Sequence, residues 1–202
     1  MYLSSNTSEK TDKMIAGVDE VGVGPIAGPV VAAAVILNPQ HKVYKLKDSK
    51  ILTAEVREIL YARIMDKALD VSIGLANVSE IDTLNIFHAT MLAMERAIKG
   101  LILTPSLILI DGRSQPKMDF PIQTIIRGDQ TEKPISAASI IAKVTRDRLM
   151  KNFHEQYPLY HFDEHKGYST KKHQRAILEH GICPLHRRSF NFIKNYLDTT
   201  AP

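Results

Sequence analysis

Short apolar runs mark the expected strands of this chain. Residues 14–21 and 28–37 are rich in apolar side chains and are separated by a glycine-rich turn, which predicts two adjacent strands in a hairpin. Residues 107–110 form a short continuous apolar run, which is typical of a buried, central strand in a parallel arrangement. The runs at 71–78 and 122–126 predict two more strands.

Apolar residues at helical spacing fill the segments between and after these runs. They predict helices over residues 53–69, 79–98, 135–157, 170–180 and 190–197. Thr53 is the expected N-cap of the first helix. In the second, Ser79 and Asp82 resemble a capping box, and Gly100 provides a stop signal. The pattern predicts an α/β architecture with a mixed sheet, followed by a helical C-terminal segment.

Composition narrows the class of protein. The chain has 202 residues, of which 44% are hydrophobic and 24% charged, which fits one domain or one domain with a small appendage. The single cysteine, Cys183, excludes a disulfide framework and a cysteine-rich zinc site. No apolar stretch approaches the roughly 20 residues that cross a bilayer, and residues 1–13 form a polar, flexible tail without an apolar signal core. We therefore expect a cytoplasmic protein without a membrane partner.

Basic residues are concentrated late in the chain. Residues 143–194 contain 11 Lys and Arg against 5 Asp and Glu, whereas the remainder contains 15 against 17. Six of the eight histidines fall in the same segment. A basic region attached to a slightly acidic body indicates a polyanionic partner, although a solvated helical surface explains the same pattern.

Four carboxylates lie at or near the ends of predicted strands: Asp19, Glu20, Asp111 and Asp129. Ligands of open α/β sheets gather at such ends, and charge within an apolar segment is costly without a partner. Oxygen ligands without a cysteine cluster favour Mg²⁺ or Mn²⁺ over zinc. Neighbours in a regular strand point to opposite faces, so Asp19 and Glu20 serve one site only if the strand bends or ends there.

Glycines surround the acidic pair. Gly22 and Gly24 follow Glu20 directly, with Val23 between them, and allow a ligand to approach the backbone closely. A tight hairpin turn explains the glycines equally well. The loop is not a dinucleotide-binding turn, because a third glycine is missing and a strand, not a helix, follows.

Seven ordered motifs resemble the ribonuclease HII family of bacteria, over about residues 14–195. They comprise residues 16–35, 46–50 with 52–53, 81–86 with 89–91, 110–112 with 128–129, 136–147, 165–168 with Thr170, and 184–190. The resemblance implies a ribonuclease H-like fold with a mixed five-stranded sheet, a catalytic domain over 14–150 and a helical substrate-binding extension over 151–202. It also implies an endonuclease that cleaves the RNA strand of RNA–DNA hybrids and cuts 5′ of ribonucleotides embedded in duplex DNA. The expected products carry 3′-hydroxyl and 5′-phosphate ends, and the expected cellular roles are ribonucleotide excision and RNA-primer removal during replication.

The resemblance also assigns roles to residues. It makes Asp19, Glu20, Asp111 and Asp129 the catalytic and metal-binding acids. We expect two divalent ions during catalysis, with Asp19 shared between them, Asp111 and Asp129 completing one each, and Glu20 assisting through water or its backbone. By the same resemblance, the substrate-binding residues are Gly22, Val23, Gly24 and Tyr168. From the placement of basic charge, we expect Lys47, Lys50, Lys143, Arg187 and Arg188 to hold phosphates. Gly22 and Gly24 would line the ribose 2′-hydroxyl through backbone groups, and Tyr168 would lie at the RNA–DNA junction.

The sequence departs from the family pattern at Val23, where arginine is usual. The change removes a phosphate contact but leaves the backbone contacts intact. Two other functions remain open: a four-acid nuclease that cuts only DNA, against which the glycine loop argues, and a nucleic-acid-binding module without catalysis, against which the four acids argue. We expect the protein to act as a monomer.

Overall fold

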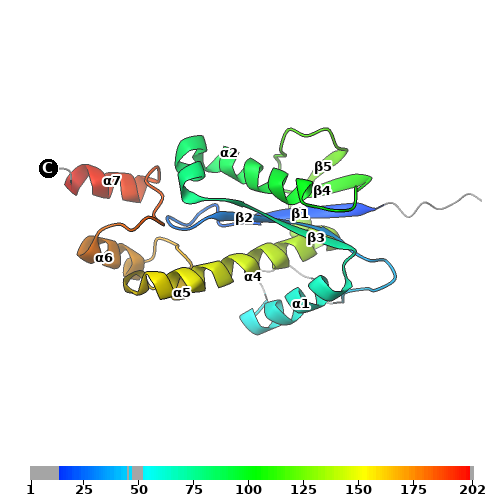
Figure 1. Ribbon diagram of the computed structural model, residues 1–202, viewed down its shortest axis with the longest axis horizontal. Helices are drawn as coiled ribbons and strands as arrows, with labels where there is room; N and C mark the ends of the chain where they lie inside the picture. Colours follow the sequence, from blue (N-terminus) through cyan, green and yellow to red (C-terminus); the bar gives the residue numbers. More distant parts are fainter. Residues whose placement is uncertain (1–13, 45, 47–51, 201–202) are drawn as a thin grey trace, which may run out of the picture.

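Five strands form one mixed sheet in the order β3-β2-β1-β4-β5 (Figure 1). Strand β1 (Ile15–Val21) pairs antiparallel with β2 (Val30–Ile36), which pairs antiparallel with β3 (Asp70–Ala76). On its other side β1 is parallel to β4 (Leu107–Asp111), which is parallel to β5 (Ile122–Ile125). The structure is a computed structural model that describes residues 14–44, 46 and 52–200. It confirms the predicted hairpin and the mixed five-stranded sheet.

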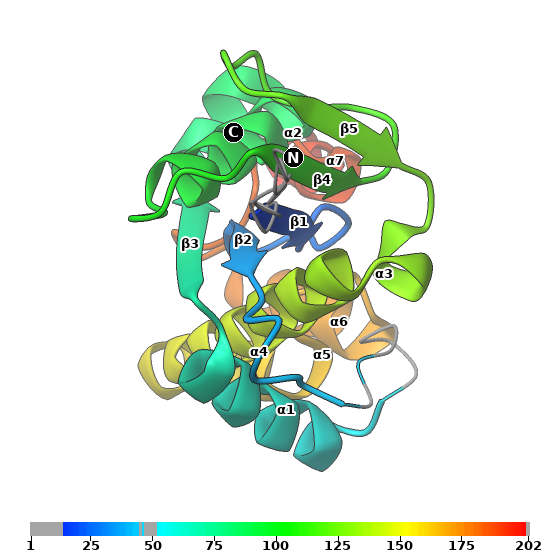
Figure 2. The same ribbon diagram turned by 90° about the vertical axis from the view of Figure 1, so that its right-hand side faces the viewer.

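Helices cover both faces of the sheet (Figures 1 and 2). Helix α2 (Val78–Lys99) lies on one face, and α4 (Lys133–Gln156) with α1 (Ala54–Lys67) lies on the other. Strand β2 shows why this arrangement forms, because alternate side chains point to opposite faces. Its even-numbered residues Val30, Ala32 and Ala34 pack toward α2, and its odd-numbered residues Val31, Ala33 and Val35 pack toward α1 and α4. Both faces of the strand are therefore buried.

The helix ends follow ordinary capping chemistry, with one correction. Thr53 caps α1 as predicted. Helix α2 starts earlier than expected: Asn77 is its N-cap and forms the capping box with Glu80, so the predicted box of Ser79 and Asp82 is wrong. The Asp82 carboxylate instead accepts hydrogen bonds from the backbone N–H groups of residues 188 and 189, at 3.0 and 2.9 Å. It ties α2 to the C-terminal segment.

The C-terminal elements gather at one end of the layers (Figure 1). They are η1 (Pro158–Tyr160), α5 (Phe162–His165), α6 (Lys171–His180) and α7 (Asn191–Thr200). Their apolar side chains, including Phe162, Ile177 and Ile193, form a third core with Ile26 and Ala27 from the glycine loop. Helix α4 passes through residue 150 without a break, so the boundary predicted there lies within a helix.

Three short elements were not predicted from the sequence: α3 (Gly128–Thr131) and α5, each of four residues, and η1, of three. Such pieces are too short to show a helical period. Within the described residues, no helix combines the length and apolar character needed to cross a bilayer.

Candidate active site

Three carboxylates converge at one edge of the sheet. One oxygen each from Asp19, Asp111 and Asp129 lies within 4.8 Å of the others, and Asp19 and Asp129 are buried. Parallel pairing of β1 with β4 brings two of them together, because Val18 faces Ile110 in the register and the acids are the next residues along. The third comes from α3 and not from a strand end.

A turn of unusual backbone conformation places Asp129. Arg127 adopts a left-handed conformation, with φ 58°, and so redirects the chain from the end of β5 into α3. The N–H of Gly128 then donates to Asp111 Oδ1 at 2.7 Å. One short segment thus supplies the third acid and orients the second.

Burial and like charges act on Asp19. Loss of hydration raises the pKa of its carboxyl well above the usual value, and the negative charges of Glu20 and Asp111 raise it further. Hydrogen bonds from the Ser139 hydroxyl and from the Glu20 N–H, the latter at 2.8 Å, partly oppose this. Ser139 was not among the expected site residues; its place in the 136–147 motif was the only signal for it.

Glu20 stands apart from this group of three. Its side chain is only partly buried, and it is not a member of the converging set, although its charge acts on Asp19. This agrees with strand alternation, since Asp19 and Glu20 are neighbours in β1 and face opposite sides.

The donor set fits a hard divalent cation. All three groups are carboxylates, and holding them this close together with two of them buried is unfavourable unless positive charge compensates. Oxygen ligands of this type suit Mg²⁺ or Mn²⁺ and not zinc. The residues that would hold the metal are therefore Asp19, Asp111 and Asp129.

We expect Asp19→Asn to raise the thermal stability of the metal-free protein. A carboxyl whose pKa is raised by folding destabilises the fold increasingly as pH rises from its unfolded pKa toward its folded pKa, and the whole penalty is present above both. Asn keeps the acceptor for the Glu20 N–H and removes the charge. At neutral pH in chelator, the melting temperature should rise by about 2–4 °C for each kcal/mol relieved.

A melting series with and without Mg²⁺ or Mn²⁺ checks this expectation. The wild type should gain stability from the metal, and the variant should gain much less. A variant that melts below the wild type in chelator would contradict the electrostatic account of Asp19.

The glycine loop lies beside the acids, and Tyr168 lies against it. Val23 and Gly24 are exposed and Gly22 is buried, with φ +95°. A Cβ atom added at Gly24 would lie 3.6 Å from Cε1 of the Tyr168 ring, which is itself 47% exposed. The structure thus brings together two of the residues expected to contact the substrate.

Arg187 requires a correction. It was expected to contact a phosphate, but its side chain is fully buried. Its guanidinium donates to the carbonyl oxygens of Gly28, Val23 and Gly22 at 2.9, 3.1 and 2.6 Å. A group enclosed in this way cannot reach a phosphate on the surface, so Arg187 acts on the loop itself.

The other expected basic contacts are placed differently. Lys47 and Lys50 lie outside the described residues. Lys143 forms an ion pair with Asp147, one turn along α4, with 2.7 Å between Nζ and Oδ1. Arg188 is exposed, next to the buried Arg187.

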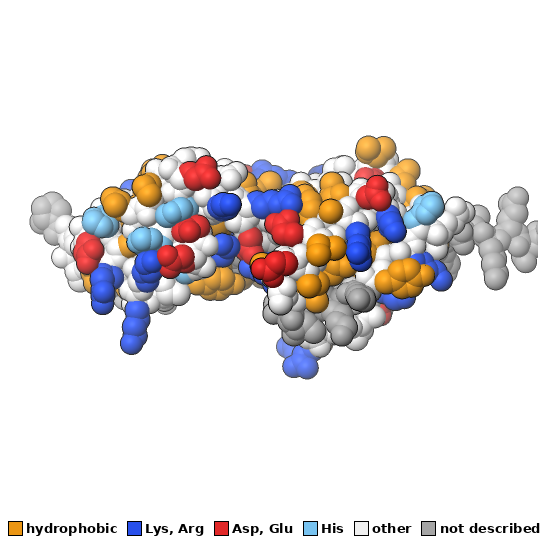
Figure 3. All heavy atoms as spheres, turned by 90° about the horizontal axis from the view of Figure 1, so that it is seen from below, with side chains coloured by type: hydrophobic (Ala, Val, Ile, Leu, Met, Phe, Trp, Pro, Cys, Tyr) orange, Lys and Arg blue, Asp and Glu red, His pale blue; other side chains and the backbone are white. Residues whose placement is uncertain are grey.

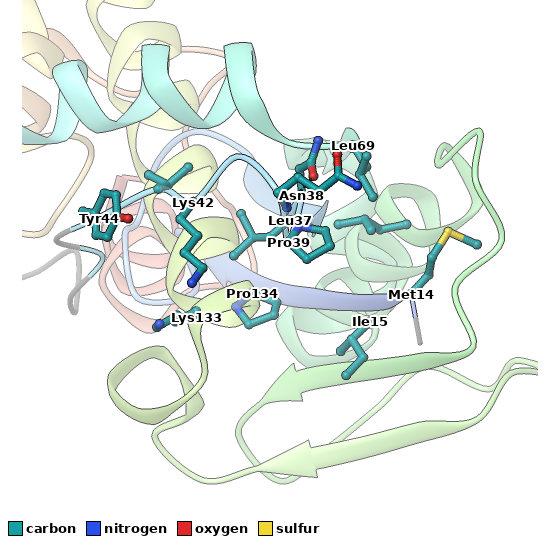
Figure 4. A pocket seen from close by; sticks show the side chains of 13 residues that line it. Met14, Ile15, Leu37, Asn38, Pro39, Lys42, Tyr44, Leu69, Lys133 and Pro134 are labelled. Carbon is teal, nitrogen blue, oxygen red and sulfur yellow. Dashed lines mark hydrogen bonds between the residues drawn. The ribbon is translucent and has the colours of Figure 1, made fainter. Parts of the chain in front are cut away.

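One well-formed cavity lies away from the acids. It has a volume of about 600 Å³ and lies where β1 begins, β2 ends and α4 begins (Figure 4). Its lining is mainly apolar and includes Met14, Leu37, Pro39, Tyr44 and Pro134. None of the three acids lines this cavity.

Fold and site together define a class, the ribonuclease H-like hydrolases. A solved structure, the ribonuclease H2 from Pyrococcus horikoshii, superimposes with a TM-score of 0.78 at 26% identity, covering 92% of this chain and 97% of that one. The model of the family described as Ribonuclease HII matches residues 16–193. The chain belongs to the ribonuclease HII family.

Curated relatives agree with this assignment over nearly the whole chain. A ribonuclease HII of Burkholderia lata is 51% identical over 94% of this chain and 88% of its own. One of Shewanella amazonensis is 52% identical over 93% and 91%. The protein is thus a hydrolytic ribonuclease H that acts on RNA–DNA hybrids and depends on a divalent metal.

Proposed function

We propose that this enzyme also cuts duplex DNA on the 5′ side of an embedded ribonucleotide, leaving 3′-hydroxyl and 5′-phosphate ends. The observation that carries the proposal is the position of the acids next to an exposed glycine loop, with the Tyr168 ring beside Gly24. Cleavage and recognition of a single nucleotide then occur on one continuous surface. In the cell, such an activity serves ribonucleotide excision and RNA-primer removal, in the cytoplasm and by a monomer.

The acids supply the chemistry of hydrolysis. Asp19, Asp111 and Asp129 would hold two divalent ions, Mg²⁺ or Mn²⁺, which would supply an acidified water molecule and offset negative charge on the phosphate. Gly128 and Ser139 hold the Asp111 and Asp19 carboxylates in place. Glu20 assists from the neighbouring position in β1. No covalent intermediate is needed.

The loop and Tyr168 supply the specificity. The 2′-hydroxyl is the group that distinguishes RNA from DNA, and backbone groups of residues 22–24 can hydrogen-bond to it without a side chain. Stacking of an aromatic ring is tolerant of base sequence, which suits Tyr168 at the junction. Arg188 and Lys143 are the described basic residues that we assign to phosphate contacts. On the face seen in Figure 3, acidic side chains are mixed with Lys and Arg.

The proposed incision is tested with a duplex that carries one ribonucleotide and a different label on each end of that strand. We expect a single cut 5′ of the ribonucleotide, an upstream product that a polymerase extends, and a downstream product whose 5′-phosphate a ligase accepts. A cut on the 3′ side, or no cut while a long RNA–DNA hybrid is degraded, would contradict the proposal.

Val23 offers a test of how the loop reads its substrate. If backbone groups carry the recognition, Val23→Arg should tighten binding to a single-ribonucleotide duplex through a new phosphate contact, by about tenfold at most. It should create no activity on an all-DNA duplex. Steady-state cleavage by both forms measures this. An inactive wild type with an active variant would show that the side chain, and not the backbone, is essential.

A further inference from the structure

Two buried arginines lie under the glycine loop and are not part of the metal site. Arg146 is 1% exposed and Arg187 is fully buried. Neither forms an ion pair with a carboxylate among the described residues. Loss of hydration lowers the pKa of Arg146 to about 10 and that of Arg187 to about 9, so both stay charged at neutral pH. Burying two cations without an ion pair to either is unfavourable, so their hydrogen-bond partners are informative.

Both guanidiniums donate hydrogen bonds to backbone carbonyl oxygens of the same region. Arg146 donates to Pro29, Lys166 and Ala27 at 2.9, 2.8 and 3.1 Å. It therefore joins the end of the glycine loop to the turn that carries Tyr168. The loop also packs directly on this side chain, because a Cβ added at Gly22 would lie 2.3 Å from Arg146 Nε.

Arg187 determines which way two successive peptide groups face. In a trans peptide, the C=O of one residue and the N–H of the next point in opposite directions, and the described residues contain no cis peptide. The Gly22 and Val23 carbonyls both point at the buried guanidinium. Consequently the N–H groups of Val23 and Gly24 point away from it.

These two N–H groups are available for a ligand. Val23 and Gly24 are exposed, and within the described residues neither N–H has a protein partner. Adjacent backbone N–H groups that point the same way form a concavity for an anion or another oxygen acceptor. The cation behind them polarises both peptide groups in the direction that strengthens the donors.

We propose that Arg187, supported by Arg146, is a positioning residue that turns the Val23 and Gly24 N–H groups outward as a pair of donors to an oxygen of the bound ribonucleotide. The inference rests on the proposed recognition of a single ribonucleotide by this loop. The acceptor is either the 2′-hydroxyl oxygen or an oxygen of the adjoining phosphate, and both present the same lone-pair chemistry. Val23 has no positive charge where arginine is usual, and the buried Arg187 supplies a positive charge behind the loop instead.

Binding in chelator, where no cleavage occurs, tests the proposal. Three duplexes of one sequence carry at the centre a ribonucleotide, a deoxynucleotide, or a ribonucleotide flanked by uncharged methylphosphonates. The wild type should prefer the first over the second if the acceptor is the 2′-hydroxyl, and over the third if it is the phosphate. Arg187→Lys keeps the charge but offers one ammonium to three carbonyls. In the Arg187→Lys protein, the preference for the ribonucleotide duplex over the less tightly bound duplex should fall by about tenfold. The affinity for that less tightly bound duplex should stay as in the wild type.

Arg148→Lys is the matched control. Arg148 lies on α4 near Arg146, but it is exposed and pairs with Glu58. It should bind all three duplexes as the wild type does. Full preference in a folded Arg187→Lys protein would overturn the inference and leave the proposed function intact. A wild type that binds all three duplexes equally would overturn the proposed recognition itself.

Amide exchange in the wild type tests the same point without a variant that must fold. In the free protein the Val23 and Gly24 amides should exchange quickly with water, and they should become protected when the single-ribonucleotide duplex binds. Protection of both amides in the free protein would show that they point inward and would contradict the proposal.

Discussion

Replacing Asp111 with Asn is expected to reduce cleavage of an RNA–DNA hybrid by about 10³-fold or more. The change preserves volume and keeps the oxygen that accepts from the Gly128 N–H, but it removes one of three charges that would hold the metal. Losing about 4 kcal/mol of transition-state stabilisation corresponds to this factor. Asp19→Asn and Asp129→Asn should behave in the same way, and Glu20→Gln should be less damaging because Glu20 lies outside the group.

The matched control for this series is Asp119→Asn. Asp119 is exposed on the connection between β4 and β5, so the same substitution removes a carboxylate away from the site. Single-turnover cleavage at saturating Mn²⁺, with a melting curve for each protein, measures the effect. A folded Asp111→Asn enzyme with turnover near that of the control would remove Asp111 from the site.

Gly17→Ala is expected to lower the free energy of unfolding strongly. A Cβ at this position of β1 would lie 2.0 Å from the carbonyl carbon of Pro134 and 2.2 Å from the backbone nitrogen of Ile135. Both belong to the start of α4, whose backbone cannot yield without moving the helix. Overpacking typically lowers the free energy of unfolding by about 1–3 kcal/mol. Because the added methyl group would meet backbone atoms of both residues, we expect a loss of about 3 kcal/mol or more.

Gly24→Ala provides the comparison, because its added methyl group would meet only the Tyr168 ring, at an ordinary 3.6 Å. Chemical denaturation of both variants should show a large loss of unfolding free energy for Gly17→Ala and a change within about 0.5 kcal/mol for Gly24→Ala. Equal stabilities would contradict the close packing of α4 on β1.

The sequence predicted most of what positions the acids. Alternation and apolar runs indicated the strands, and the continuous run at 107–110 correctly indicated a central parallel strand. The convergence of Asp19 with Asp111 follows from that pairing. Asp129 converges for a different reason, because α3 and the left-handed Arg127 are local features that leave no period in the sequence.

The buried arginines show what the pattern could not indicate. A basic residue in a basic segment normally lies on the surface, so the sequence predicts a phosphate contact for Arg187 as it does for Arg188. Only the tertiary packing of the 184–190 segment under the glycine loop separates the two, since one side chain is enclosed by carbonyls and the other is exposed. The capping error at α2 has a similar cause, because Asp82 serves a contact 106 residues away in the chain.

The central claim is that the three converging carboxylates and the glycine loop form one metal-dependent site that acts at ribonucleotides. Its most direct measurement compares cleavage of three duplexes, an RNA–DNA hybrid, a DNA duplex with one ribonucleotide and an all-DNA duplex, with Mg²⁺ or Mn²⁺ and with chelator. We predict cleavage of the first two only with metal, and none of the third under any condition. Cleavage of the all-DNA duplex, or cleavage in chelator, would contradict the account.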